Sequence, residues 1–226
     1  MISISNVNDN YKLCHITGGT GFVGKWMRKL QPYNMIAYYY NRVQENRTGW
    51  YKKNANYIVH LAPVAPTFAI ECARRNNARL LYASSGAVYH PEYQDKEYRS
   101  NKIKWEQECL DSGVDVVIAR LFTFMDSSRA YNAIFSAVRG GKRPQIATDC
   151  VRSFMHGREM ARWLWAILLQ GENGHAYDVG SDRAYTMIEL AKRIQAFTGC
   201  GYHEYLGPVA MPTYLPPNIA KTKALL

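Results

Sequence analysis

A glycine-rich turn between an expected strand and an expected helix constrains the fold of this chain more than any other feature. The turn runs from Thr17 to Gly24 and follows a short β-prone run that ends at Ile16. Glycines at 18, 21 and 24 carry no Cβ atoms, so the backbone can approach a ligand closely. A pyrophosphate is stabilised by the free N–H groups at such a helix N-terminus. A turn of this kind is also common without any ligand, so other segments have to decide.

A tyrosine and a lysine four residues apart, Tyr98 and Lys102, form the second feature. On a helix this spacing places both side chains on one face, one turn apart. A lysine ammonium beside a phenol favours the phenolate, which makes such a pair a usable general acid/base near neutral pH. The ordinary alternative is an exposed pair on a charged helix surface.

A buried strand that ends in hydroxyl groups lies upstream of this pair. The apolar run from Leu80 to Ala83 is followed by Ser84, Ser85 and Gly86. A hydroxyl at the end of a strand can hydrogen-bond a substrate oxygen while the tyrosine transfers its proton. A serine-rich turn that only closes a strand is the alternative. The three features in this order indicate a common site more strongly than any one of them.

Strand and helix signals alternate through the first two thirds of the chain. We expect strands near residues 13–16, 35–40, 57–62, 79–84 and 114–119. We expect helices near residues 22–30, 67–76, 98–111, 129–139, 157–170 and 186–198. This alternation predicts an α/β fold with a parallel sheet and helices on both faces.

The chain resembles the extended short-chain dehydrogenases/reductases of the NAD-dependent nucleotide-sugar epimerase/dehydratase kind, as a shortened member. The motifs that carry the resemblance, in the order of the family, are the glycine turn, residues 57–62, 84–89, the Tyr98/Lys102 pair, and residues 119–122, 152–156 and 177–181. The family implies a Rossmann-type, doubly wound parallel sheet with a small C-terminal substrate-binding lobe. We expect an NAD(P)-binding core over residues 1–125. Residues 126–226 are expected to complete this core and to form the lobe.

The resemblance implies a set of cofactor contacts around the glycine turn. The residues that would hold the pyrophosphate are Gly18, Gly21 and Gly24. Phe22 and Val23 would line the cofactor, and Ala62 would lie near the nicotinamide-side ribose. The cofactor is NAD or NADP, and Arg42 after the second expected strand favours NADP because an arginine can accept the 2′-phosphate. A solvent-facing arginine in a basic loop is the alternative for Arg42.

The resemblance also implies catalytic and substrate-binding roles. Tyr98 would be the acid/base, Ser85 would polarise the reacting oxygen, and Lys102 would hold the nicotinamide ribose. Arg152 matches a position that grips the substrate diphosphate, a task that suits a guanidinium, although an ordinary surface cation is the alternative. Thr123 stands where the family usually has an asparagine that helps to hold the substrate phosphate.

Two departures from the family pattern narrow the expected reaction. Gly86 and Ala87 stand where the family's 4,6-dehydratases carry an Asp-Glu pair, and neither residue can move a proton. The sequence therefore argues against dehydration by that mechanism. Several connections are also short, which suits a compact enzyme or a non-catalytic relative. The presence of Ser85, Tyr98 and Lys102 together favours the enzyme.

The expected function is that of an NAD(P)-dependent nucleotide-sugar 4-epimerase or 4-keto-sugar reductase, which transfers hydride with a tyrosine as acid/base. The sequence does not separate these two reactions. One alternative is a non-catalytic NADP(H)-binding regulator. Another is an RNA-binding relative, since the chain has a formal net charge of +10 and 17 tyrosines. No compact nucleic-acid-binding motif is evident, so the enzyme is favoured.

Composition and residue spacing indicate the cellular class of the protein. The five cysteines are scattered, which suggests reduced thiols, and the histidines are too dispersed to indicate a metal site. No apolar run approaches the ~18 residues of a membrane span, so we expect a cytoplasmic protein. Family members commonly dimerise through helices that here correspond to residues 67–76 and 98–111, which predicts a homodimer. The proline-rich stretch of residues 208–217 is expected either to pack over the lobe or to be a loose end.

Overall fold

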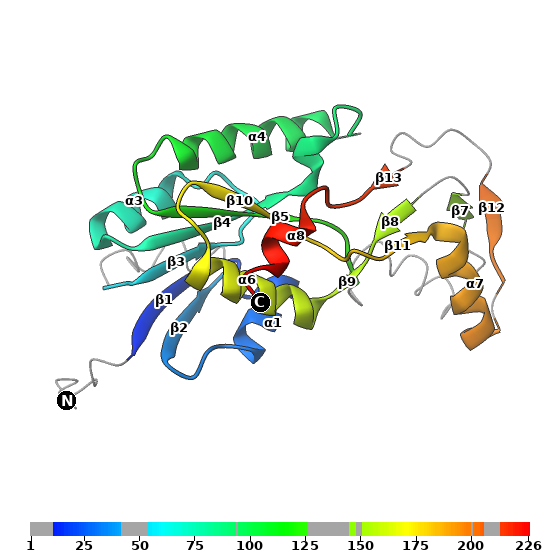
Figure 1. The fold of residues 1–226 in the computed structure, drawn as a ribbon, viewed down its shortest axis with the longest axis horizontal. Coiled ribbons are helices and arrows are strands. Elements are labelled where there is room, and N and C mark those ends of the chain that lie inside the picture. Colours follow the sequence, from blue (N-terminus) through cyan, green and yellow to red (C-terminus); the bar gives the residue numbers. More distant parts are fainter. Residues whose placement is uncertain are drawn as a thin grey trace.

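A six-stranded parallel sheet forms the centre of the protein in the computed structural model (Figure 1). Its strands are β1 (Lys12–Thr17), β2 (Met35–Tyr40), β3 (Tyr57–His60), β4 (Arg79–Ser85), β5 (Val116–Leu121) and β10 (His175–Val179). The strand order is β10-β5-β4-β3-β1-β2, and every pairing is parallel. The chain therefore runs outward in one direction from β1 to β2 and in the other from β3 to β10. Ligands of doubly wound sheets bind at such a switch point, beyond the carboxyl ends of the strands.

The structure describes residues 11–41, 54–93, 95–125, 145–147, 151–199, 201–205 and 213–226. The expected helix over residues 129–139 and the proposed cofactor residue Arg42 lie outside these ranges.

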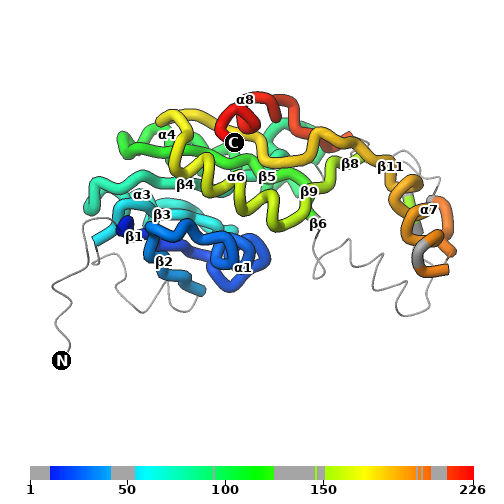
Figure 2. Tube along the Cα trace, turned by 60° about the horizontal axis from the view of Figure 1, so that its bottom comes forward, coloured from blue at the N-terminus to red at the C-terminus, as the bar shows by residue number. Residues whose placement is uncertain are grey.

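Helices cover both faces of the sheet, as the alternation of strand and helix signals predicts (Figures 1 and 2). The helices of one face are α1 (Phe22–Lys29) and α6 (Gly157–Gln170), and those of the other are α3 (Thr67–Asn76) and α4 (Lys96–Leu110). Successive side chains of a strand point to opposite faces. Leu81 and Val117 therefore join the core cluster under α1 and α6, whereas Leu80 and Val116 join the cluster under α3 and α4.

Most of the predicted elements are confirmed to within two residues at each end. The helices predicted over 67–76 and 157–170 coincide with α3 and α6. Helix α4 begins two residues earlier than predicted, because the Asp95 carboxylate caps it by accepting the Tyr98 N–H at 2.8 Å. The fold class is therefore the predicted one, a Rossmann-type parallel sheet with helices on both faces.

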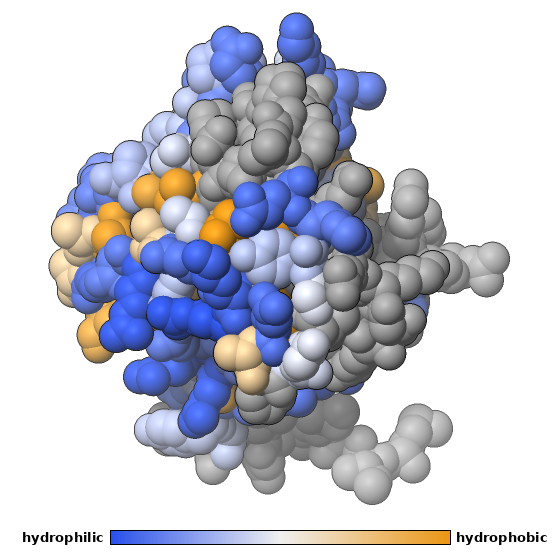
Figure 3. Space-filling model, turned by 90° about the vertical axis from the view of Figure 1, so that its right-hand side faces the viewer, coloured by the Kyte–Doolittle hydropathy of each residue, from blue (hydrophilic) through white to orange (hydrophobic). Residues whose placement is uncertain are grey.

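A small lobe lies beyond the carboxyl ends of the strands (Figure 1). Its elements are β7 (Gln145–Ala147), β8 (Val151–Ser153), β11 (Ala184–Thr186), α7 (Met187–Thr198), β12 (His203–Tyr205) and β13 (Thr213–Tyr214). They form the sheets β11-β8-β13 and β12-β7, and Ala191 and Ile194 of α7 pack on Ile146 in a separate core cluster. A capping box between Thr186 and Glu189 begins α7. Among the residues that the structure describes, hydrophilic ones predominate on the surface at this end of the molecule (Figure 3).

Three short elements connect the lobe with the main sheet. They are β6 (Phe124–Met125), its partner β9 (Met155–His156), and α8 (Ile219–Lys223). Helix α8 is held on β10, since the Thr222 hydroxyl donates to the Asp178 carbonyl at 2.7 Å. The last described residues therefore return from the lobe to the core.

The described residues contain no helix that is long and apolar enough to cross a membrane. They also contain no group of three or more His, Cys, Asp or Glu side chains that could hold a metal ion. The thiols of Cys14, Cys72 and Cys109 are buried and free, and burial raises the pKa of each, to about 12 for Cys72 and Cys109. These three thiols are therefore protonated and unreactive at neutral pH.

Candidate active site

The glycine-rich turn lies at the switch point of the sheet, between β1 and α1. Gly18 has a φ of +68°, and a Cβ at this position would lie 2.9 Å from the backbone nitrogen of Ala62. A Cβ at Gly24 would lie 2.5 Å from the Cα of Gly19. Glycine is therefore required for the turn to close against the end of β3. Gly21 is the N-cap of α1 without a side-chain cap, so the first N–H groups of this helix can bind an anion.

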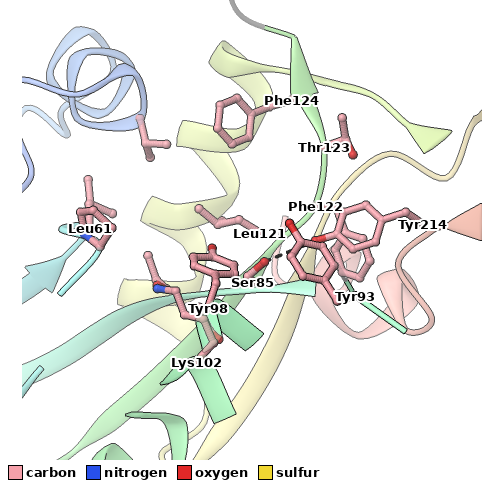
Figure 4. Close-up of a pocket in the computed structure, with 14 residues that line it drawn as sticks. Leu61, Ser85, Tyr93, Tyr98, Lys102, Leu121, Phe122, Thr123, Phe124 and Tyr214 are labelled. Carbon is pink, nitrogen blue, oxygen red and sulfur yellow. Dashed lines mark hydrogen bonds between the residues drawn. The ribbon is translucent and has the colours of Figure 1, made fainter. Parts of the chain in front are cut away.

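A pocket of about 280 Å³ lies beside α1, at the carboxyl ends of β4 and β5 (Figure 4). Five residues to which the sequence assigns a role line it, namely Val23, Ser85, Tyr98, Lys102 and Thr123. These residues come from α1, β4, α4 and the segment after β5, and they are up to 100 positions apart in the sequence. The fold thus brings the candidate catalytic residues together.

Tyr98 and Lys102 both face this pocket from α4, as their spacing predicts (Figure 4). The Asp95 cap fixes the start of the helix and places Tyr98 in its first turn. The Lys102 Nζ lies 5.8 Å from the centre of the Tyr98 ring. The two side chains therefore lie close together on one face of α4.

Lys102 is buried, with only 4% of its surface exposed. Its Nζ donates to the Ala83 carbonyl at 2.9 Å and to the Tyr82 hydroxyl at 3.2 Å. Burial lowers the pKa of Lys102 from 10.5 to about 8, against the opposing effect of the Glu106 carboxylate. The ammonium form therefore predominates at neutral pH. An ammonium has three donors, so one remains for a ligand beyond these two described partners.

A neutral histidine, His60, packs against the ring of Tyr82. The His60 ring stacks on Tyr82 with 6.1 Å between ring centres, and its Nε2 donates to the Val64 carbonyl at 3.0 Å. Its Nδ1 therefore accepts from the Thr17 hydroxyl at 2.9 Å. Burial lowers the pKa of His60 to about 4, so the ring carries no charge at neutral pH. No role for His60 was predicted, although the residue lies within the 57–62 motif.

Ser85 ends β4 and begins a 3₁₀ turn over Gly86–Tyr89. Its Oγ accepts the Ala87 N–H at 3.2 Å and lies 3.3 Å from the Tyr214 hydroxyl. Only 6% of the Ser85 surface is exposed, and the residue lines the pocket. The hydroxyl is therefore fixed by protein contacts before any ligand arrives.

Gly86 packs closely against the ring of Phe122. A Cβ at Gly86 would lie 2.6 Å from the Cε1 and Cζ atoms of that ring. An aspartate at this position, as in the family's dehydratases, would collide with Phe122. The packing of Gly86 against Phe122 therefore leaves no room for an aspartate at this position.

Other predicted residues lie outside the pocket. Phe22 stacks on Phe124, with 5.0 Å between ring centres, and Ala62 lies under the glycine turn. Arg152 is on β8 of the lobe, where its guanidinium donates to the Val151 carbonyl at 2.8 Å, and it is not among the pocket-lining residues. Arg152 therefore does not line the pocket, although its strand pairs with the strand that carries the pocket-lining Tyr214.

Aromatic residues that the sequence analysis did not assign narrow the pocket on the lobe side (Figure 4). Tyr214 packs at 5.0 Å from Phe122 and at 6.4 Å from Tyr93, measured between ring centres. Tyr93 in turn lies 6.0 Å from Tyr98. Only the expectation that residues 208–217 pack over the lobe pointed toward Tyr214, and it named no residue. The described part of that stretch does pack there.

Comparison with known proteins identifies the same family that the motifs indicate. The sequence model of the NAD dependent epimerase/dehydratase family matches residues 28–180. No curated protein sequence matches the chain.

Solved structures similar to the chain share its fold at low sequence identity. A UDP-N-acetylglucosamine 4-epimerase from Methanobrevibacter ruminantium, in complex with UDP-N-acetylmuramic acid, has a TM-score of 0.81 and 17% identity over 96% of this chain and 92% of that one. A dTDP-glucose 4,6-dehydratase from Bacillus anthracis, in complex with NAD, has a TM-score of 0.78 and 16% identity over 94% and 89%. RMD from Pseudomonas aeruginosa, complexed with NADPH, has a TM-score of 0.76 and 18% identity over 95% and 92%.

Proposed function

Since the chain belongs to the NAD-dependent epimerase/dehydratase family, we propose that it is an NAD(P)-dependent enzyme that acts on a nucleotide sugar. The reaction is 4-epimerisation or the reduction of a 4-keto sugar, by hydride transfer with tyrosine acid/base catalysis. The observation that carries the proposal is the pocket shared by Ser85, Tyr98 and Lys102 beside the glycine turn. The 4-epimerase among the similar structures supports a nucleotide sugar as the substrate class.

The residues around the glycine turn fit a nicotinamide dinucleotide. Any Cβ at Gly18 or Gly24 would fill the space that the turn needs, and the N-terminus of α1 favours a pyrophosphate. Phe22 and Val23 would line the cofactor, and Ala62 would lie near the nicotinamide-side ribose. The remaining donor of Lys102 would bind a hydroxyl of that ribose. A bound nicotinamide would accept or supply the hydride at the sugar carbon.

Two side chains of the pocket would contact the oxygen on the reacting sugar carbon, and a third would act on one of these two. Tyr98 would take the proton from the sugar hydroxyl or give it to the ketone oxygen. Ser85 would donate a hydrogen bond to the same oxygen, and the Lys102 ammonium would stabilise charge on the Tyr98 phenol. Proton transfer by a positioned side chain typically accelerates a reaction by about 10²- to 10⁴-fold.

We further propose that the substrate phosphates bind on the lobe side, at Thr123 and Arg152. Thr123 lines the pocket, and Arg152 is the register partner of the pocket-lining Tyr214 on the neighbouring strand. An arginine fork matches the geometry of phosphate oxygens.

The preferred cofactor in this proposal is NADP, on the basis of Arg42. The similar structures include complexes with NAD and with NADPH, so the family accommodates both. Arg42→Asp should shift the ratio of NADPH to NADH affinity toward NADH, because a carboxylate repels the 2′-phosphate. The exposed Arg75→Asp variant on α3 is the control. An unchanged ratio in Arg42→Asp would refute this assignment.

We also propose a homodimer formed through α3 and α4. Phe68 on α3 and Ile103 and Leu110 on α4 are each 41% exposed. Burying such side chains against a second copy would remove apolar surface from water. A monomer mass by light scattering at micromolar concentration would contradict this proposal.

The decisive experiment compares cofactor binding with turnover in the wild type, Tyr98→Phe and Tyr33→Phe. Tyr33 is 93% exposed and serves as the matched control. NADPH and NADH binding would be titrated by fluorescence, and turnover would be measured with UDP-glucose, UDP-N-acetylglucosamine and 4-keto sugar nucleotides. We expect all three proteins to bind cofactor, and Tyr98→Phe to lose at least about 10²-fold in turnover. Equal turnover in Tyr98→Phe and the wild type would refute the proposed mechanism.

A further inference from the structure

Tyr214 reaches the candidate catalytic serine from the opposite end of the chain (Figure 4). Strand β13 holds it in place by pairing with β8, and the ring packs 5.0 Å from Phe122 and 5.0 Å from His90. Only 7% of Tyr214 is exposed, and it lines the pocket. Its hydroxyl lies 3.3 Å from the Ser85 Oγ. The aromatic packing thus delivers one polar atom to one position in the pocket.

The hydrogen-bonding capacity of Ser85 makes this contact informative. A serine hydroxyl has one proton to donate and two lone pairs that accept. One lone pair of Ser85 Oγ is used by the Ala87 N–H at 3.2 Å. If Ser85 donated to Tyr214, its only proton would point away from the substrate. If Tyr214 donates instead, both lone pairs are filled and the Ser85 proton is left for the pocket.

We propose that the Tyr214 hydroxyl donates to Ser85 Oγ and thereby directs the Ser85 proton toward the oxygen of the reacting sugar carbon. The inference rests on the proposed function and deepens it. Tyr214 is then a positioning residue that acts through Ser85 and makes no bond to the reacting atoms itself. Consecutive hydrogen bonds, here from Tyr214 to Ser85 and from Ser85 to the sugar oxygen, strengthen one another in a buried site.

The proposal distinguishes a directed hydrogen bond from simple packing. A ring that only fills space would be replaced by phenylalanine without loss, since Tyr214→Phe keeps the contacts with Phe122 and His90. A directing hydroxyl matters only while Ser85 carries its own hydroxyl. The effect of Tyr214→Phe must therefore depend on residue 85, which a double-mutant cycle measures.

The test uses the full chain as wild type, Tyr214→Phe, Ser85→Ala and the double variant. Tyr185→Phe is the matched control. Tyr185 lies on β11 of the same three-stranded sheet, and it is the register partner of Arg152 on one side of β8, as Tyr214 is on the other side. Turnover is measured with the nucleotide-sugar probe that the wild type converts best, with the oxidised cofactor for a UDP-sugar and NADPH for a 4-keto sugar. We expect Tyr214→Phe to lower kcat about two- to tenfold with little change in KM, the range of one neutral hydrogen bond. We expect no further loss when it is added to Ser85→Ala, and no loss in Tyr185→Phe.

Equilibrium unfolding in urea tests the hydrogen bond between Tyr214 and Ser85 without any substrate. Tyr214→Phe should raise the unfolding equilibrium constant about two- to tenfold in the wild type and less in the Ser85→Ala background. Equal losses from Tyr214→Phe in both backgrounds, in turnover or in stability, would overturn the inference and leave only packing. A wild type that converts no probe would refute the proposed function and the catalytic consequence, while the urea cycle would still decide the Tyr214–Ser85 bond.

Discussion

Replacing Gly86 by alanine tests how tightly the site is packed. The added Cβ would lie 2.6 Å from two atoms of the Phe122 ring, whereas carbon atoms in contact prefer about 3.5–4.0 Å. Gly86 is not among the glycines with positive φ, so its backbone accepts alanine without strain. The whole cost of Gly86→Ala therefore comes from the displacement of Phe122.

The surroundings of Phe122 set the size of this cost. The side chain is only 3% exposed, and its backbone N–H is fixed to the Val179 carbonyl at 2.9 Å. Tyr214 stands at 5.0 Å on one side of the ring and leaves little room for retreat. Inserting a methyl group into such a core typically costs 1–3 kcal/mol, so we expect Gly86→Ala to lower the free energy of unfolding by about 1–3 kcal/mol.

Urea denaturation of four proteins checks this expectation: the wild type, Gly86→Ala, Phe122→Leu and the double variant. In the Phe122→Leu background the ring is gone, and Gly86→Ala should be neutral or stabilise by up to about 1 kcal/mol, because alanine restricts the unfolded chain. The reasoning fails if Gly86→Ala costs the same in both backgrounds, or if it costs nothing in the wild type.

Three further outcomes follow from the described contacts. In Gly18→Ala the positive φ is combined with a clash between the new Cβ and the backbone, whereas Gly174 has a similar φ of +75° and no atom within 4 Å of the new Cβ. Calorimetry should therefore show a larger loss of stability for Gly18→Ala than for Gly174→Ala. Titration should show a loss of cofactor binding for Gly18→Ala and none for Gly174→Ala. Lys102 has a pKa of about 8 in the folded protein against 10.5 in the unfolded chain, so the unfolded state holds more protons between these values. The wild type should therefore gain stability relative to Lys102→Met as the pH rises from about 8 to 10.5, by at most about 1.4 kcal/mol per pH unit, and a constant difference would contradict the burial argument. Arg120→Gln should cost about 3–5 kcal/mol in urea, because it leaves the buried Glu106 carboxylate of α4 without its partner. Arg75→Gln, which breaks an exposed pair of the same 2.6 Å length, should cost far less, and similar losses in the two variants would be inconsistent with this contrast.

The fold was predictable where local signals set the boundaries of the elements. Helix α3 ends where Asn77 adopts a left-handed conformation, and α4 ends shortly before Gly113, which has a φ of +72°. Strand β10 was not among the predicted strands, because Asp178 interrupts its apolar pattern. The Asp178 carboxylate is buried there by hydrogen bonds from the Tyr89 hydroxyl and the Asn218 N–H, and neither partner is a neighbour in the sequence.

In the candidate site, too, the residues in local motifs were predictable and those placed by contacts between distant segments were not. Ser85, Tyr98 and Lys102 belong to motifs whose spacing places them on one strand end and one helix face, and the structure brings them to one pocket. Their assigned roles remain predictions. Tyr214 follows from no local pattern, because its place depends on the pairing of β13 with β8. The contact of Gly86 with Phe122 likewise joins residues of different elements.

The separation of 129 positions between Ser85 and Tyr214 bears on how the site forms during folding. The glycine turn closes against Ala62 across a few tens of residues, whereas the Tyr214 contact must close a far longer loop at a higher entropic cost. Contacts between distant residues also slow the folding of a chain. A refolding chain would therefore recover the glycine turn first and the complete pocket later. Cofactor binding and turnover would then return with different rates, and the slower rate would report the docking of the lobe.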